Sequence, residues 1–194
     1  MDRLVAFGCS NTFGQGLPDP IKLSWPQLLA NKLDIECYNG GVLGASNKQI
    51  MNQVMTFPFR TTDVCIVMWS YLSRYTILDQ EYGRYYTYQE LNYDNQILPQ
   101  MLDNRKSKYY YRYVYNETDH LNMTLHYINY TKLHLEKLNI KNYHTCCDEI
   151  DTPLTFNIEF EKLRHEFPKG TDNSHPGIDA HIEIAERIYK RILL

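Results

Sequence analysis

The segment DVCIVMW at residues 63–69 constrains the fold of this chain more than any other feature. After its first residue it is continuously apolar, and it is rich in β-branched residues and too short for an ordinary helix. A strand of this kind must be covered on both faces. Such strands are typical of a parallel sheet with helices on either side.

Short apolar runs alternate with helical patterns along most of the chain. Strands are expected at residues 3–7, 34–39, 63–69 and 140–147, and helices at residues 24–33, 46–55, 119–138 and 177–194. This alternation predicts a three-layer α/β/α fold with a central, mainly parallel sheet. No linker divides the chain, so we expect a single domain over residues 1–194.

One segment interrupts the alternation. Residues 79–118 hold ten of the 17 tyrosines, including YYYRYVY at residues 109–115. A connection of this length is unusual, which predicts an insertion with its own structure. If residues 109–115 are extended, alternate tyrosines share one side, and Tyr111 could contact a bulky substrate such as a glycan. The alternative is that these tyrosines pack the insertion onto the core or a neighbouring subunit.

Charge and hydropathy exclude several classes of partner. The formal net charge is -3, so no basic surface for nucleic acid is expected. The longest apolar run, residues 64–69, is far shorter than the ~20 residues that span a bilayer. The first ten residues, MDRLVAFGCS, lack the apolar core of a signal peptide. We expect a soluble protein without a signal peptide or membrane span.

The cysteines give no sign of a disulfide framework or a metal site. There are five, an odd number without regular spacing, which favours a reducing compartment. HTCC at residues 144–147 contains no Cys-x-x-Cys pair, and buried free cysteines are common. We expect no metal and no cofactor.

Ser10, in the stretch FGCSNTFGQG, follows the first expected strand. Ligands of open α/β sheets bind at the carboxyl ends of the strands, where Ser10 would lie. A serine nucleophile needs a base that is oriented by a third group. Asp172 and His175, three residues apart in TDNSHPG, could supply both. The simpler alternative is that Ser10 and Asp172 only stabilise turns.

The order of these motifs resembles the SGNH hydrolases, also called GDSL esterases and lipases. The first block is Gly8-Cys9-Ser10, NGGVLGAS at residues 39–46 places Gly44 at the oxyanion-hole position, and the final Asp-x-x-His block is intact. The resemblance implies a flavodoxin-like three-layer fold and hydrolysis of esters, often acetyl esters of carbohydrates or lipids. In that reading Ser10 attacks the carbonyl carbon, His175 carries the proton and Asp172 orients His175.

The third block departs from the family pattern. The family has Gly-x-Asn-Asp after the third strand, whereas MWSYLSRY at residues 68–75 contains no asparagine. Losing one oxyanion donor commonly costs ~100- to 1000-fold in rate. The expected oxyanion hole is Ser10, Gly44 and, as a replacement donor, Ser70. The alternatives are that the positive charge of Arg74 compensates, that activity is low, or that the protein is no longer an enzyme. Polar residues near the site that could bind substrate are Asn47, Arg74 and Tyr111.

Two classes of function stay open. The complete Ser10, Asp172 and His175 set favours a serine esterase that acts on a small-molecule or glycan ester. The missing asparagine favours an SGNH-fold binding or structural module with weak or no catalysis. The Asn- and Tyr-rich composition and the small size suggest that such a module could be a bacteriophage virion component. The expected location is accordingly the cytoplasm or a virion, and a homo-oligomer or virion assembly stays open.

Overall fold

A computed structural model describes residues 1–78, 85–88, 104–148, 150 and 156–193. Its centre is a four-stranded, wholly parallel sheet in the order β2-β1-β3-β6. The strands are β1 (Arg3–Gly8), β2 (Glu36–Gly41), β3 (Asp63–Trp69) and β6 (Lys141–Cys146). This order matches the first strands of the doubly wound, flavodoxin-like arrangement.

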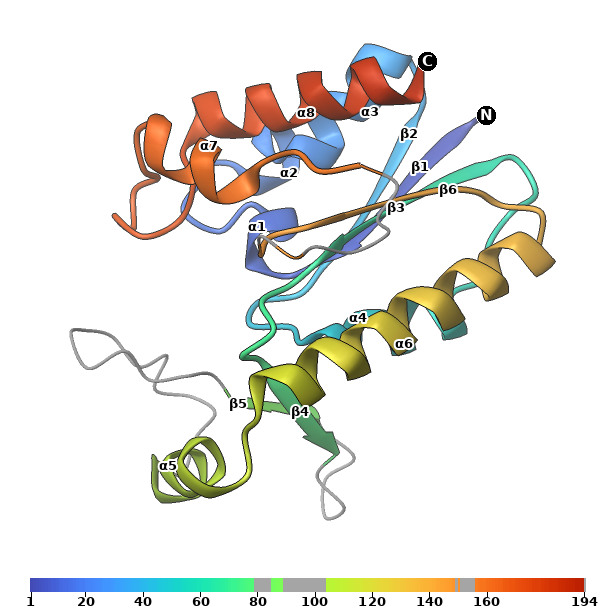
Figure 1. The fold of residues 1–194 in the computed structure, drawn as a ribbon. Helices are drawn as coiled ribbons and strands as arrows, with labels where there is room; N and C mark the ends of the chain where they lie inside the picture. The colour runs from blue at the N-terminus through green and yellow to red at the C-terminus, as the bar shows by residue number, and fades with distance from the viewer. Residues whose placement is uncertain (79–84, 89–103, 149, 151–155, 194) are drawn as a thin grey trace.

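Helices cover both faces of the sheet (Figure 1). On one side lie α3 (Trp25–Leu33), α8 (Ile178–Ile192) and α7 (Phe160–Glu166), which contacts α8. On the other side α4 (Asn47–Thr56) packs against α6 (Glu117–Lys137). The predicted three-layer α/β/α fold is therefore confirmed. No helix in the described part of the chain has the length and apolarity needed to cross a membrane.

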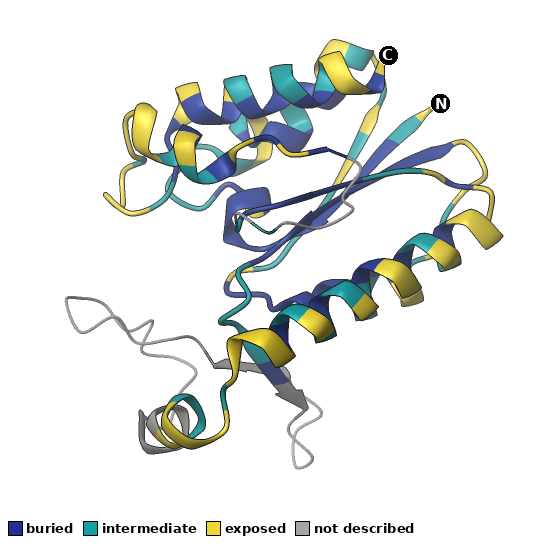
Figure 2. Cartoon of the chain, in the orientation of Figure 1, coloured by how far each residue is buried: buried dark blue, intermediate teal, exposed yellow. Residues whose placement is uncertain are grey.

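Burial follows the sequence pattern. All seven residues of β3 are buried, as a strand covered on both faces requires. Figure 2 shows the burial concentrated in the inner strands of the sheet, whereas the edge strand β2 is mostly exposed or half-buried. On α8 the buried residues recur at helical spacing; they are Ala180, His181, Ile184, Ala185, Ile188 and Ile192. The apolar stripe of α8 therefore faces the sheet.

The predicted strands and helices are confirmed, with small shifts at their ends. The strands are those expected at residues 3–7, 34–39, 63–69 and 140–147, and the helices are those expected at residues 24–33, 46–55, 119–138 and 177–194. The second strand differs most, because Gly40 and Gly41 continue it where we expected its end. Gly41 passes so close to the turn after β1 that a Cβ there would lie 2.3 Å from the backbone nitrogen of Phe13.

Three short helices were not predicted. They are α1 (Ser10–Phe13), α2 (Pro20–Leu23) and α7. Each spans seven residues or fewer, too few for an apolar period to be recognised.

The predicted insertion at residues 79–118 lies partly outside the described residues. Its described parts are residues 85–88 and 104–118. They contain β5 (Tyr85–Tyr88), which pairs antiparallel with β4 (Tyr75–Leu78), α5 (Asn104–Tyr113) and the start of α6. Because α5 is a helix, the alternation expected for an extended YYYRYVY segment is wrong. Ring contacts instead join residues four apart, as on a helix surface: Tyr109 contacts Tyr113 at 4.9 Å between ring centroids.

Aromatic contacts attach α5 to the core. The Tyr110 ring stacks on Tyr75, with centroids 4.8 Å apart, and its hydroxyl hydrogen-bonds His120 Nε2. His120 Nδ1 lies 2.8 Å from the Leu72 carbonyl oxygen, so Nδ1 carries the proton and Nε2 accepts from Tyr110. The Tyr111 hydroxyl donates to the Ser73 carbonyl. These tyrosines therefore join α5 to the turn after β3.

Candidate active site

Ser10 lies in a tight turn at the carboxyl end of β1. The strand ends at Gly8, and the amides of Thr12 and Phe13 each donate to the Cys9 carbonyl oxygen at 3.0 Å. A Cβ at Gly8 would lie 2.0 Å from Thr12 Oγ1, so only glycine allows this turn to close. β1 is flanked by β2 and β3, where an α/β sheet of this kind binds ligands.

Asp172 and His175 lie in the loop that precedes α8. Asp172 Oδ1 accepts the backbone N–H groups of Ser174 and His175, both at 3.0 Å, so the carboxylate folds its own loop. The Thr171 amide donates to the Gly16 carbonyl at 2.8 Å and fastens this loop to the segment after Ser10. Gly16 has a φ of 87°, and a Cβ there would lie 2.8 Å from Asp172 Oδ1.

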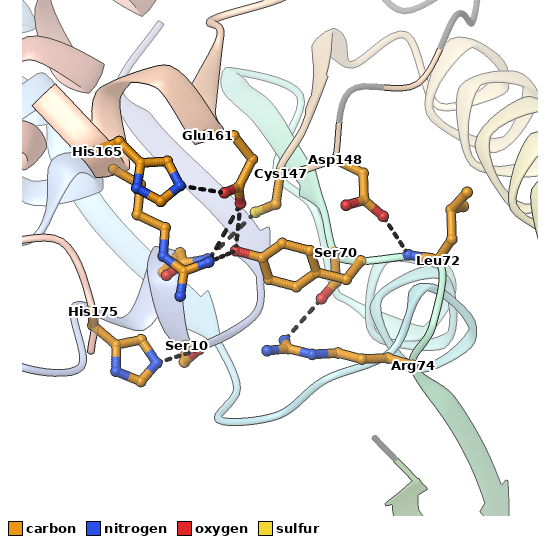
Figure 3. A network of polar contacts seen from close by, with 12 residues as sticks. Ser10, Ser70, Leu72, Arg74, Cys147, Asp148, Glu161, His165 and His175 are labelled. Atoms are coloured by element: carbon orange, nitrogen blue, oxygen red, sulfur yellow. Dashed lines mark hydrogen bonds and ion pairs between the residues drawn. The ribbon is translucent and has the colours of Figure 1, made fainter. Parts of the chain in front are cut away.

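These two loops bring Ser10, His175 and Asp172 into one hydrogen-bonded chain. His175 Nε2 lies 3.1 Å from Ser10 Oγ, and His175 Nδ1 lies 2.6 Å from Asp172 Oδ2 (Figure 3 shows the Ser10–His175 contact). With its proton on Nδ1, the imidazole donates to the carboxylate and presents the Nε2 lone pair to the serine hydroxyl. Residues from opposite ends of the sequence thus meet in the arrangement that a serine nucleophile requires.

The charge of Asp172 suits this arrangement. Burial raises the pKa of Asp172, but the N–H groups of His175 and Ser174, together with the His175 side chain, outweigh it and lower the pKa to about 2. Asp172 is therefore a carboxylate at neutral pH and can stabilise a protonated His175. The side chains of His175 and Asp172 are 20% and 30% exposed, so the site borders solvent.

Gly44 lies in the loop between β2 and α4, with a left-handed φ of 71°. The Val42 amide donates to the Gly8 carbonyl at 3.0 Å, which holds this loop against the end of β1. Neither the Ser10 N–H nor the Gly44 N–H donates to any residue that the structure describes. Both amides can therefore serve an incoming acceptor.

Ser70 and Asn47 are fixed to each other. Ser70 is fully buried, its amide donates to Asn47 Oδ1 at 2.7 Å, and its carbonyl accepts from Asn47 Nδ2 at 3.2 Å. Asn47 Nδ2 also donates to Thr124 Oγ1 at 3.1 Å. The amide of Asn47 is thus occupied within the protein, where it positions the backbone of Ser70 at the end of β3.

Arg74 closes the turn after β3. Its Nη1 group donates to Ser70 Oγ at 2.8 Å and to the Ala45 carbonyl at 3.4 Å. Its guanidinium carbon lies 4.9 Å from the centroid of the Tyr71 ring. Figure 3 shows the guanidinium reaching the Ser70 side chain.

Sequence reasoning missed a polar network that borders these residues (Figure 3). The Tyr71 hydroxyl donates to Glu161 Oε1 at 2.9 Å and accepts from Arg164 at 3.2 Å. Asp148 Oδ2 accepts the Leu72 N–H at 2.6 Å, and burial raises the pKa of Asp148. Tyr71 and Asp148 each follow a buried strand closely, and that position was the signal that could have found them.

Comparisons with known proteins support the fold of this chain, but they match it to no family model and to no curated protein. A lipase, Lip_vut3 from a goat rumen metagenome, has 11% identity and a TM-score of 0.60, with 98% of this chain and 97% of that one covered. A G-D-S-L family protein from Desulfitobacterium hafniense DCB-2 has 14% identity and a TM-score of 0.53, with both chains covered completely.

A third solved structure is the acetyl xylan esterase Est2A from Butyrivibrio proteoclasticus. It has 12% identity and a TM-score of 0.56, and the match covers 98% of this chain and 63% of that one. The chain has the fold of the G-D-S-L lipolytic proteins. The fold implied by the sequence blocks at Ser10, Gly44 and Asp172–His175 is confirmed.

Within this G-D-S-L fold, position 9 holds cysteine where the family block has aspartate. The Cys9 side chain is fully buried and hydrogen-bonds Cys147, which also accepts from Asn11 Nδ2 at 3.5 Å. The contact with Cys147 lowers the pKa of Cys9 against the effect of burial, and the nearby charge of Arg74 and a hydrogen bond with Ser70 lower it further. Cys9 therefore links the Ser10 turn to the end of β3.

Proposed function

We propose that this protein is a serine ester hydrolase in which Ser10 is the nucleophile, His175 the general base and Asp172 the group that orients His175. The observation that carries this proposal is the unbroken hydrogen-bonded chain from Ser10 Oγ through His175 to Asp172, with contacts of 3.1 and 2.6 Å. The G-D-S-L fold agrees with it, because that fold sets Ser10 at the ligand-binding edge of the sheet.

The reaction follows from the positions of the three groups. As Ser10 Oγ attacks the ester carbonyl, its proton passes to His175 Nε2, and the charge of Asp172 stabilises the imidazolium that forms. The ester C–O bond then breaks, and His175 returns the proton to the departing alcohol. Water, deprotonated by His175, attacks the acyl group on Ser10, and the acid leaves as the Ser10 hydroxyl is restored.

The negative charge on the carbonyl oxygen needs donors. The backbone N–H groups of Ser10 and Gly44 are the first two, because neither has an acceptor among the described residues. Ser70, the expected third donor, is fully buried and accepts a hydrogen bond from Arg74. We therefore assign Ser70 and Asn47 a positioning role.

For the substrate class, we propose acyl esters, with acetylated carbohydrate as the first candidate. The fold shared with the acetyl xylan esterase Est2A supports this choice. The exposed tyrosines of α5 also support a carbohydrate substrate, because tyrosine rings stack on sugars. Tyr109 is 62% exposed and Tyr113 is 64% exposed. Contact with substrate through Tyr111 would use its ring, since its hydroxyl donates to Ser73.

The test is hydrolysis of p-nitrophenyl acetate and of acetylated xylan by the purified chain. Ser10→Ala should reduce turnover to the buffer rate while the protein stays folded. Thr56→Ala, which removes an exposed hydroxyl at the end of α4, is the matched control and should keep full activity. Wild-type protein that hydrolyses neither ester would contradict the proposal and favour a binding module on the same fold.

A further inference from the structure

Arg74 is a half-buried guanidinium without an ion pair among the described residues. Other partly buried arginines do form ion pairs: Arg3 Nη2 lies 2.6 Å from Asp63 Oδ2, and Arg187 Nη1 lies 3.0 Å from Glu159 Oε2. Removing a charge from water without a partner costs free energy. Arg74 therefore forms no close ion pair with a described carboxylate. Its charge does act on Asp148, whose pKa Arg74 lowers against the effect of burial.

The guanidinium is nonetheless held in a fixed place. Its Nη1 group is occupied by Ser70 Oγ and the Ala45 carbonyl, and its plane lies near the Tyr71 ring. The Nε and Nη2 groups donate to no described residue. A guanidinium anchored through one nitrogen, with its remaining N–H groups unused, is preorganised to bind an anionic oxygen.

Its anchors are the two loops that flank the nucleophile. Ala45 follows Gly44, whose N–H is one oxyanion donor. Ser70 directly follows β3, which pairs with β1, the strand that ends two residues before Ser10. The guanidinium therefore bridges the segments that carry the two backbone donors. It also belongs to the segment after β3, where the G-D-S-L pattern has the asparagine that this chain lacks.

We propose that Arg74 is a catalytic residue that supplies the third oxyanion donor of this site, in place of the missing asparagine. The inference rests on the proposed function of Ser10 as the nucleophile. When the Ser10 Oγ–carbon bond forms, the carbonyl π electrons move onto oxygen. The N–H groups of Ser10, Gly44 and Arg74 then donate to that oxygen, and Arg74 keeps all its protons.

In this account Ser70 and Asn47 act through Arg74. Asn47 fixes the Ser70 backbone from both sides, and Ser70 Oγ fixes the Arg74 Nη1 group. Ser70→Ala removes one of two anchors and leaves the guanidinium in place. Its effect on kcat should therefore be smaller than that of Arg74→Met, which has no donor. The opposite order would make Ser70 the donor and overturn the inference.

The experiment compares wild type, Arg74→Met and the control Arg60→Met on two acetyl esters of one shape, anionic 4-acetoxybenzoate and neutral 4-acetoxybenzamide. Methionine is similar in length to arginine and has no hydrogen-bond donor. Arg60 pairs with Glu36 on the exposed surface at the other edge of the sheet. We expect Arg74→Met to lower kcat about 100- to 1000-fold on both esters, with little change in KM, since the lost interaction forms only in the transition state. Arg60→Met should match wild type.

The outcomes separate this inference from the proposed function. If wild type hydrolyses the esters and Arg74→Met keeps its kcat, the inference fails and the role of Ser10 stands. A loss confined to 4-acetoxybenzoate would show that Arg74 binds a charge on the substrate, which also overturns it. If wild type hydrolyses neither ester, and a fluorophosphonate leaves Ser10 unlabelled, the proposed function itself fails.

A chemical rescue covers the case in which Arg74→Met folds poorly. Arg74→Ala leaves a space beside Tyr71 and Ser70 that methylguanidinium can enter. Added methylguanidinium should restore part of the kcat of Arg74→Ala and none of that of Ser10→Ala. Thermal unfolding of each variant shows whether it is folded. A folded Arg74→Ala with wild-type kcat would overturn the inference.

Discussion

Acid should destabilise this protein through two buried histidines. Burial lowers the pKa of His144 to about 3, helped by the charge of Lys132, and lowers that of His181 to about 4, helped by His175. His181 Nδ1 accepts the Trp25 N–H at 3.1 Å, which requires an unprotonated nitrogen. Both imidazoles are therefore neutral in the folded state at neutral pH.

The direction in which pH changes the stability follows from the number of protons that the folded and unfolded states bind. In the unfolded chain a histidine takes up its proton near pH 6.5, whereas these two stay neutral in the folded chain until about pH 4 and 3. The unfolded state thus binds more protons in this window, and stability is lost as the pH falls from 6.5. At pH 5 each histidine costs about 2 kcal/mol, and together they cost about 4 kcal/mol.

The assay is urea unfolding from pH 8 to pH 5, followed by the fluorescence of Trp25 and Trp69, which are both fully buried. A loss of about 4 kcal/mol is a large part of the 5–15 kcal/mol typical of a folded domain. His144→Asn should halve the pH dependence of the unfolding free energy, because it removes one of the two titrating imidazoles. The side-chain oxygen of the new asparagine can still accept from Trp69 Nε1, as His144 Nδ1 does at 3.1 Å.

His126→Asn, at an exposed position on α6, is the matched control and should keep the wild-type pH dependence. Unfolding free energies that stay constant between pH 7 and pH 5 would refute the reasoning. So would a His144→Asn variant with the full wild-type loss.

Four further outcomes are expected. The rate of p-nitrophenyl acetate hydrolysis between pH 4 and pH 9 should show no step from Asp172, whose pKa is about 2. Asp172→Asn should lower kcat on the order of 10⁴-fold, and a loss under about tenfold would contradict its role. Gly44→Ala, at a φ of 71°, should cost about 1 kcal/mol in thermal unfolding and lower kcat by displacing an oxyanion donor. Tyr110→Phe should cost about 1 kcal/mol of stability through the lost bond to His120, with ester hydrolysis unchanged.

The layers of the fold could be predicted because their signals are local and long. The all-apolar segment at 63–69 requires cover on both faces, and the stripe on α8 repeats over several turns. The helical state of 109–115 could not be predicted in this way. Tyrosine favours strands on its own, whereas the contacts that hold Tyr110 and Tyr111 in a helix come from Tyr75, His120 and the turn after β3.

The candidate site, like the fold, could be predicted from the sequence only in part. Asp172 and His175 could be proposed because their spacing and the loop before α8 are visible in the sequence. The partnership of Asn47, Ser70 and Arg74 could not, because it joins the start of α4 to the end of β3 through side-chain geometry. No periodic pattern in the sequence indicates that contact. The sequence allows Asn47 to be a substrate contact or a first-turn residue of a helix. In the structure it lies in the first turn of α4, and its amide hydrogen-bonds Ser70 and Thr124.

The most direct test of the central claim is the site at which a fluorophosphonate modifies the protein, located by intact mass and peptide mapping. An activated serine should give a single adduct on the peptide that contains Ser10. The adduct should be absent in Ser10→Ala and should form far more slowly in His175→Ala, because the hydroxyl then loses its base at 3.1 Å. No adduct on wild type, or an adduct elsewhere, would contradict the assignment of Ser10 as the nucleophile.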